Sequence, residues 1–173
     1  MPTTIIVCGA PGSGKTTYAR KLAADCAATL LDIDTVTERL VRLCLVESGH
    51  SQDDRDSEYF KRTYREPVYE ALFDIARENV AIKNVVIAGP FTKEIADPNW
   101  PEKLSEKLCC PVEVHYVQCS PGVRRQRLAV RGDARDRAKL QDWDRYIEYY
   151  GEESPPVFEH VLVNGEYTYK LNE

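Results

Sequence analysis

The chain has 173 residues, a length that fits one globular domain. Its residues are 43% hydrophobic and 29% charged, the balance of an ordinary soluble fold, and no apolar run approaches the roughly 18 residues of a membrane span. Acidic residues outnumber basic ones by 28 to 23, for a net charge of −5, so the basic footprint of a dedicated nucleic-acid binder is missing. Six scattered cysteines form no CxxC pair, which disfavours a zinc site and favours reduced thiols in the cytoplasm.

Short apolar segments alternate along the chain with longer segments of helical periodicity, a pattern typical of a parallel α/β sheet. The predicted strands are Thr4–Cys8, Thr29–Asp32, Asn84–Ala88, Val112–Val117 and His160–Val163. The predicted helices are Lys15–Ala27, Thr35–Glu47, Tyr59–Lys83, one that Pro121 opens and one from Leu140 to Tyr150. Pro67 predicts a kink or a new helix at that position. The proline-containing segment 89–101 is predicted to be a long functional loop. No linker divides the chain, so we expect one domain over residues 1–173.

The most specific motif follows the first predicted strand. It reads Gly9-Ala10-Pro11-Gly12-Ser13-Gly14-Lys15-Thr16, a full match to the phosphate-binding loop G-x-x-x-x-G-K-[ST]. Glycines allow successive backbone N–H groups to converge on one anion, and the following helix adds its positive N-terminal end. Lys15 supplies a cation for the β- and γ-phosphates, the Thr16 hydroxyl can bind Mg²⁺, and Thr17 joins the predicted nucleotide-binding residues. The motif therefore predicts binding of a nucleoside triphosphate with Mg²⁺.

Two absences narrow the class of P-loop protein. The sequence has no Asn-Lys-x-Asp motif for guanine, and its third predicted strand ends Ile87-Ala88-Gly89, without the acidic pair of motor ATPases. The chain resembles the small P-loop kinases of the zeta-toxin, chloramphenicol phosphotransferase and polynucleotide kinase group. The resemblance implies a P-loop NTPase three-layer sandwich of the nucleoside-kinase type, with a five-stranded, mostly parallel sheet. It also implies transfer of the γ-phosphoryl group of ATP to a hydroxyl.

The segment Asp32-Ile33-Asp34 follows the second predicted strand. In the kinases that the chain resembles, an aspartate at this strand end accepts the proton of the acceptor hydroxyl, and we assign that role to Asp34. The alternative is that Asp34 only caps the next helix, but Thr35-Val36-Thr37-Glu38 already forms a capping box, which predicts Asp34 outside the helix. Asp32 is then expected either to lie in the second coordination shell of Mg²⁺ or to be the alternative base. Because Ala88-Gly89 replaces the group's usual acidic residue, we expect Thr16, the phosphates and water to hold the ion.

A lid is predicted around residues 131–138. Arginines recur on one face of the preceding helix, and a charged turn follows. They are Arg124, Arg127 and Arg131, and the turn is Gly132–Arg137. The resemblance implies that Arg127, Arg131 and Arg135 close over ATP and neutralise charge on the transferred group. The alternative is a solvated basic face paired with neighbouring aspartates.

The acceptor site is predicted from the middle of the chain, and its expected occupant is a small-molecule or nucleotide-like hydroxyl compound. The candidates are Arg39, Tyr59, Arg62, Tyr69 and Pro90–Lys93, although the two tyrosines fit the core edge equally well. Two other functions stay open: an ATP-binding regulatory or toxin-like module, and a polynucleotide 5′-hydroxyl kinase. The acidic charge balance counts against nucleic acid as the partner.

Overall fold

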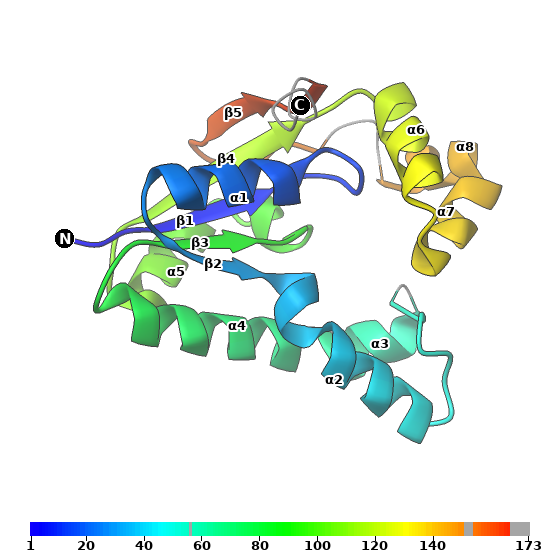
Figure 1. Ribbon diagram of the computed structural model, residues 1–173, viewed down its shortest axis with the longest axis horizontal. Coiled ribbons are helices and arrows are strands. Elements are labelled where there is room, and N and C mark those ends of the chain that lie inside the picture. The colour runs from blue at the N-terminus through cyan, green and yellow to red at the C-terminus, as the bar shows by residue number, and fades with distance from the viewer. Residues whose placement is uncertain (56, 151–153, 167–173) are drawn as a thin grey trace.

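The computed structural model describes residues 1–55, 57–150 and 154–166, apart from the side chains of residues 135, 138, 149 and 150. In this part of the chain one parallel sheet has the strand order β2-β3-β1-β4-β5 (Figure 1). The strands are β1 (Thr4–Cys8), β2 (Thr29–Asp32), β3 (Val85–Ala88), β4 (Val112–Gln118) and β5 (Val161–Asn164). All four strand pairs are parallel, so the predicted α/β architecture is confirmed.

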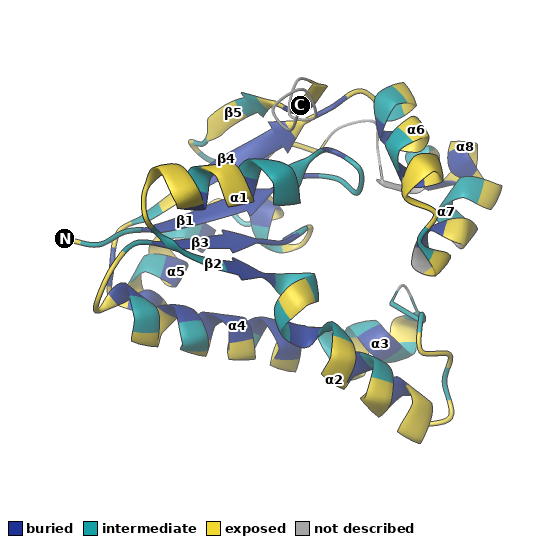
Figure 2. Cartoon of the chain, in the orientation of Figure 1, coloured by how far each residue is buried: buried dark blue, intermediate teal, exposed yellow. Residues whose placement is uncertain are grey.

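Helices cover both faces of the sheet because alternate residues of the central strand point in opposite directions. Ile5 and Val7 pack with α1 (Lys15–Asp25), which buries Ala19 and Ala23 on one face. Ile6 and Cys8 belong to the larger core on the other face, beneath α4 (Arg65–Val80) and α5 (Trp100–Leu108). Figure 2 shows β1, β3 and β4 buried between these layers.

The long helix predicted over residues 59–83 is two helices in the structure, α3 (Glu58–Thr63) and α4. The break falls at Tyr64, and Pro67 lies in the first turn of α4. A proline is tolerated there because the first N–H groups of a helix have no partner within the helix. The new helix predicted near Pro67 is therefore present. Its N-cap, Tyr64, lies three residues before the proline.

The segment predicted as a long loop over residues 89–101 is more ordered than expected. It contains a 3-10 turn, η1 (Glu94–Ala96), and ends as α5 begins at Trp100. Pro101 occupies the first turn of α5, a position that suits proline, so it starts a helix rather than interrupting one.

The C-terminal helices form a separate wall beside the sheet, with α7 facing α3 in Figure 1. They are α6 (Pro121–Arg131), η2 (Ala134–Asp136), α7 (Arg137–Gln141) and α8 (Trp143–Tyr150). Leu128, Trp143 and Tyr146 bury their side chains in a small core that joins α6 to α8. In the described residues, no helix combines the length and apolarity needed to cross a membrane.

Candidate functional site

The loop between β1 and α1 has a backbone that excludes side chains at two glycines. Gly9 has φ 141°, and a Cβ there would lie 2.5 Å from the carbonyl oxygen of Val117. Gly12 has φ 80°, and a Cβ there would lie 2.9 Å from the carbonyl oxygen of Arg124. Both conformations and both close approaches require glycine, so the loop can bring its N–H groups around an anion at the start of α1.

The Lys15 ammonium lies inside this loop. Its Nζ donates a hydrogen bond to the carbonyl oxygen of Ala10, 2.9 Å away. Burial lowers the pKa of Lys15 to about 8, while the Asp34 carboxylate opposes this shift and Arg131 adds to it. Asp34 and Arg131 therefore both lie within electrostatic reach of the lysine that would contact the phosphates.

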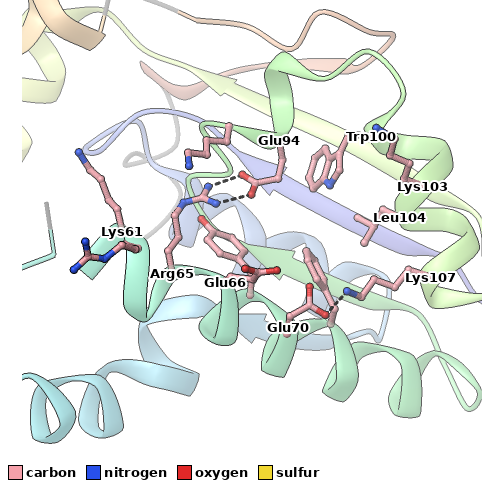
Figure 3. Close-up of a pocket in the computed structure, with 13 residues that line it drawn as sticks. Lys61, Arg65, Glu66, Glu70, Glu94, Trp100, Lys103, Leu104 and Lys107 are labelled. Carbon is pink, nitrogen blue, oxygen red and sulfur yellow. Dashed lines mark hydrogen bonds and ion pairs between the residues drawn. The ribbon is translucent and has the colours of Figure 1, made fainter. Parts of the chain in front are cut away.

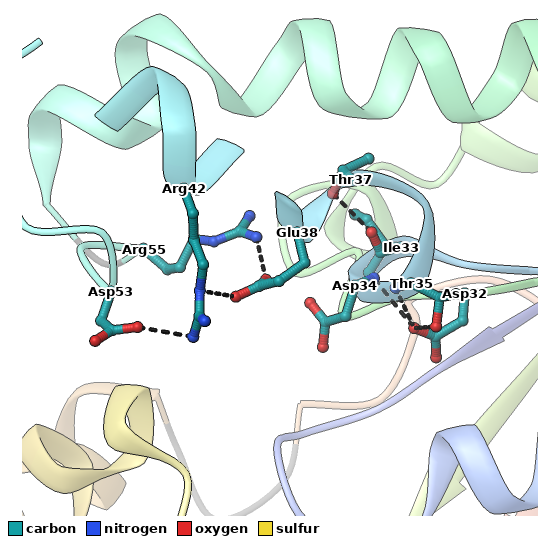
Figure 4. Close-up of polar contacts among 9 residues, drawn as sticks. All are labelled: Asp32, Ile33, Asp34, Thr35, Thr37, Glu38, Arg42, Asp53 and Arg55. Atoms are coloured by element: carbon teal, nitrogen blue, oxygen red, sulfur yellow. Dashed lines mark hydrogen bonds and ion pairs between the residues drawn. The ribbon is translucent and has the colours of Figure 1, made fainter. Parts of the chain in front are cut away.

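Asp32 connects the loop to the next helix (Figure 4). Its Oδ2 accepts a hydrogen bond of 3.0 Å from the Thr16 hydroxyl. Its Oδ1 accepts hydrogen bonds from the backbone N–H groups of Asp34 and Thr35, each 3.1 Å long. Asp32 is thus the N-cap of α2 (Ile33–Glu47), and both of its carboxylate oxygens have partners.

The prediction that a capping box leaves Asp34 outside the helix is wrong. Asp32 caps the helix three residues earlier than Thr35 would, because its carboxylate reaches the first N–H groups of α2. Asp34 therefore lies in the first helical turn, and its half-buried side chain lines the cleft next to the loop. The alternative role of Asp34 as a cap is excluded, since Asp32 fills it.

The cleft has a volume of about 780 Å³ and runs between two walls of the molecule. Pro11, Gly12, Lys15 and Thr16 form its floor at the carboxyl end of β1. One wall comes from α2, α3, α4 and the segment after β3, and the other from α6, η2, α7 and α8. Figure 1 shows these two groups of helices facing each other beyond the ends of the strands. Parallel α/β sheets bind their ligands at this edge.

Arg131 extends from the end of α6 into this cleft. Its Nε donates a hydrogen bond of 3.0 Å to Oδ2 of Asp136, and its Nη2 contacts the same oxygen. Asp136 is buried and also lies 3.9 Å from Lys139 Nζ, so one carboxylate orients two cations of the wall. Arg135 lies in η2, but its side chain is outside the part of the chain that the structure describes.

Arg127 lies behind the phosphate-binding loop. Its Nη1 donates to the carbonyl oxygens of Ser13, at 3.2 Å, and Gly165, at 2.9 Å. Its Nη2 donates to the carbonyl oxygen of Glu166, at 3.1 Å. These contacts attach the loop to the segment after β5, and the predicted contact of Arg127 with ATP stays a prediction.

On the acceptor side, a network of ion pairs fixes the segment before α3 against α2 (Figure 4). Glu38 pairs with Arg42, at 2.8 Å, and with Arg55. Arg42 also pairs with Asp53, at 2.9 Å. Arg55 lines the cleft, and sequence reasoning missed it because the polar segment around it has no periodicity that predicts a partner.

Of the predicted acceptor-site residues, Arg62, Tyr69, Pro90, Thr92 and Lys93 line the cleft. Tyr59 instead stacks on His50, with ring centroids 3.8 Å apart, and Arg39 is exposed; neither lines the cleft. Arg65, which the sequence pattern did not indicate, also lines the cleft. Its guanidinium lies 4.6 Å from the centre of the Tyr69 ring, and it forms two hydrogen bonds, of 2.8 and 2.7 Å, with Glu94.

The turn after β3 lines the cleft and contains one residue with a strained backbone. Phe91 is fully buried and has φ 47°, a left-handed conformation that costs a non-glycine residue about 1–2 kcal/mol. Its ring packs against Tyr69, Phe73 and Trp100. A Cβ on Gly89 would lie 2.9 Å from the same ring, so this position has no room for the acidic residue expected of the group unless Phe91 moves.

The described residues contain no group of three or more His, Cys, Asp and Glu side chains that could hold a metal ion. Magnesium would therefore depend on Thr16, whose hydroxyl proton already points to Asp32 and leaves its oxygen lone pairs for a cation. A hydroxyl, a nearby carboxylate and the phosphates of a bound nucleotide are hard oxygen ligands of the kind Mg²⁺ prefers. The residues present thus fit Mg²⁺ bound together with a nucleotide.

Comparison with known proteins matches the sequence to one family. The model of the AAA domain family matches residues 5–153, which is most of the chain. No curated protein matches the sequence.

Several solved structures share the fold. A protein from Chloroflexus aurantiacus J-10-fl that is assigned to the kinases has 19% identity and a TM-score of 0.64, over 94% of this chain and 86% of that chain. A sugar kinase from Janibacter sp. HTCC2649 has 18% identity and a TM-score of 0.57, over 96% and 87% of the two chains. A gluconokinase from Sinorhizobium meliloti 1021 has 20% identity and a TM-score of 0.53, over 94% and 81%. These similarities show that the fold is that of the P-loop NTPases.

Proposed function

The chain belongs to the AAA domain family, and from this premise we propose that it is an ATP-dependent P-loop kinase. In this proposal it transfers the γ-phosphoryl group of ATP to a hydroxyl group of a small-molecule or nucleotide-like acceptor. The observation that supports it most is the presence of Lys15 and Asp34 in one cleft, close enough for Asp34 to affect the pKa of Lys15. A phosphate-binding cation and a carboxylate that can orient the acceptor hydroxyl are two of the groups that enzymes use for phosphoryl transfer.

The proposed reaction is a single displacement at the γ-phosphorus. The acceptor oxygen forms the new P–O bond, the bond between the γ-phosphorus and the bridging oxygen breaks, and ADP leaves with that electron pair. Asp34 accepts the proton of the acceptor hydroxyl, so the products are the phosphorylated acceptor and ADP. Asp32 is less suited to this role, because both of its oxygens already accept hydrogen bonds.

Nucleotide binding is assigned to the loop residues and the helix start that follows them. The proposed nucleotide-binding residues are Gly9, Ala10, Pro11, Gly12, Ser13, Gly14, Lys15, Thr16 and Thr17. Thr16 would hold Mg²⁺, with Asp32 accepting the threonine proton. When bound, Mg²⁺ neutralises charge on the β- and γ-phosphates.

Charge that develops on the transferred group needs cations on more than one side. Lys15 supplies one from the floor of the cleft, and Arg131 supplies another from the opposite wall. We assign Arg131 and Arg135 to a lid over residues 131–138, with Asp136 orienting Arg131. In this arrangement the lid acts on the transition state more than on bound ATP.

The acceptor class is drawn from the cleft and from proteins of the same fold. Several charged side chains line the space beyond the phosphate-binding loop, among them Arg55, Arg62 and Lys93. Solved structures of this fold include a sugar kinase and a gluconokinase, whose acceptors carry several hydroxyl groups. A small polyhydroxylated acceptor therefore fits better than a polynucleotide.

The test is a phosphotransfer screen with purified protein, γ-labelled ATP and Mg²⁺. The panel contains nucleosides, nucleotides, sugars, sugar acids, aminoglycosides and 5′-hydroxyl oligonucleotides. We expect label in a small hydroxyl compound and formation of one ADP for each phosphorylated acceptor. Transfer to oligonucleotides alone would favour a polynucleotide kinase. Tight ATP binding with no transfer to any acceptor class would favour a regulatory module.

A further inference from the structure

We propose that the acceptor carries an oxyanion group, a carboxylate or a phosphate, which Arg62 and Lys93 bind on the acceptor side of the cleft. The inference rests on the proposed kinase function and adds the chemical class of its second substrate. It comes from the distribution of charge in the cleft and in a groove that continues from it. The alternative is that both side chains are solvated surface cations that bind no ligand.

Arg62 and Lys93 differ from the other cations around them. Each lines both the cleft and the adjoining groove, although Arg62 belongs to α3 and Lys93 follows β3 in the chain. Within the described residues, neither has a carboxylate within ion-pair distance. Two cations without a carboxylate partner that line the same cavities are notable in a chain whose net charge is −5.

The neighbouring cations are already neutralised by the protein (Figure 3). Arg65 forms its two hydrogen bonds with Glu94, and Lys107 pairs with Glu70. Lys103 pairs with Asp97 at 2.5 Å, and Lys61 with Glu58 at 3.4 Å. The fold therefore supplies carboxylates to these four cations and leaves Arg62 and Lys93 available for a ligand.

The groove provides room for an acceptor larger than a simple alcohol. It has a volume of about 400 Å³ and shares Lys61, Arg62, Arg65, Tyr69 and Lys93 with the cleft. Its one carboxylate outside these ion pairs is Glu66, which is exposed and lies in the first turn of α4. Phosphate or carboxylate oxygens placed at the shared residues would still leave acceptor hydroxyls on the Asp34 side of the cleft.

The position of Lys93 depends on strained backbone. Phe91 keeps its left-handed conformation because its ring is enclosed by aromatic side chains. Thr92 and Lys93 follow it directly and line the cleft. Strain of this kind persists where the surrounding structure enforces it, and it occurs preferentially at ligand sites. Arg62 lies in the last turn of α3, so the two cations that line the cleft come from different elements.

The first experiment measures oxyanion binding without requiring the true acceptor. Saturating Mg²⁺ and a non-hydrolysable ATP analogue fill the phosphate-binding loop, and inorganic phosphate or malonate is then titrated by calorimetry. We expect the wild type to bind at least one of the two anions, and the Arg62→Gln/Lys93→Gln double variant to bind it at least about tenfold more weakly. The phosphate and malonate arms distinguish the two oxyanion classes.

The matched control is Arg77→Gln/Lys83→Gln, which removes the same amount of charge from exposed positions away from both cavities. Its anion affinity should equal that of the wild type. Equal affinity in all three proteins, or no anion binding by the nucleotide-filled wild type, overturns the proposed site.

The second experiment compares acceptors that carry an anionic group with neutral counterparts that have a hydroxyl group in its place. Ribose 5-phosphate is paired with ribose, and gluconate with glucitol, in the phosphotransfer assay. We expect kcat/KM to favour the anionic member of at least one pair by about 100-fold and the double variant to lose that preference. Equal turnover of neutral and anionic members overturns the inference while the kinase function stands. Anion binding that depends on Arg62 and Lys93, without transfer to any acceptor, supports the site and counts against the kinase function.

Discussion

The two sides of the cleft are built in different ways. The phosphate-binding side consists of consecutive residues, and its contacts are local: Ser13 N–H donates to Ala10 O at 3.1 Å, and Lys15 Nζ donates to the same oxygen. The acceptor side gathers Asp34, Arg62 and Lys93 from three separate elements. The ion pair between Arg65 of α4 and Glu94 of η1 holds the segment after β3 in place.

This difference indicates how function is divided between the two sides. A loop fixed by glycine geometry binds phosphate wherever the motif occurs, so it identifies a class of protein and no particular substrate. The acceptor side depends on which side chains the packing brings together, and substitutions there can change the acceptor without affecting ATP. Four predictions test whether the two sides are separable in this way.

Lys15→Ala should produce the largest effect. It removes the cation from inside the phosphate-binding loop, so tight Mg-ATP binding and phosphotransfer should both be lost. Calorimetric titration with ATP measures the first and the label-transfer assay the second. Lys21→Ala is the control, because Lys21 is an exposed residue of the same helix that pairs with Asp25 at 2.8 Å. Unchanged ATP affinity in Lys15→Ala would contradict the assignment of the loop.

Asp34→Asn should affect transfer alone. The amide keeps the size of the side chain and removes the basic oxygen, so the rate should fall by about 10²–10⁴ while ATP affinity stays near wild type. Asp32→Asn provides the contrast, since it disturbs the N-cap of α2 and the Thr16 contact and should raise the Mg²⁺ requirement. Full activity in Asp34→Asn would move the base to another residue.

Two arginines of α6 should separate catalysis from structure. Arg131→Ala should lower kcat by about 10²-fold with a smaller change in ATP affinity, because it removes a cation aimed at developing charge. Arg127→Ala removes hydrogen bonds to Ser13, Gly165 and Glu166 and should lower the free energy of unfolding by about 2–3 kcal/mol. Kinetics and denaturant unfolding of both variants measure the contrast. A stable Arg127→Ala protein that has lost only kcat would instead favour its predicted ATP contact. Arg135→Ala is expected to behave like Arg131→Ala.

The pH dependence of ATP affinity should be the smallest effect. Lys15 is protonated below its pKa of about 8 and neutral above it, and the phosphates favour the protonated form. Affinity should therefore be constant from about pH 7 to 8 and fall about tenfold per pH unit above 8, a range in which the phosphates are already ionised. Calorimetry across this range measures it. The dependence should vanish in Lys15→Ala, and a slope that persists there would assign it to another group.

The sequence predicted the five strands and a parallel sheet, because each strand is a short apolar run between helical segments. It also located the phosphate-binding loop, since that geometry depends on consecutive residues and on glycines at fixed spacing. Its error at α2 has a local cause. Thr35 and Glu38 satisfy the spacing of a capping box, but the Asp32 carboxylate competes for the same N–H groups and caps the helix earlier.

Tertiary structure decided the rest. Only the packing of α6 behind the loop gives Arg127 its backbone partners, and only the aromatic cluster around Phe91 accounts for glycine at position 89 and directs Lys93 to the cleft. Pairs such as Arg65 and Glu94 are far apart in the chain, and neither residue has a spacing that marks the other. The sequence alone thus determined the fold and the phosphate-binding loop, because both are encoded in local patterns. The acceptor side depends on contacts between distant segments, which exist only once the chain has folded.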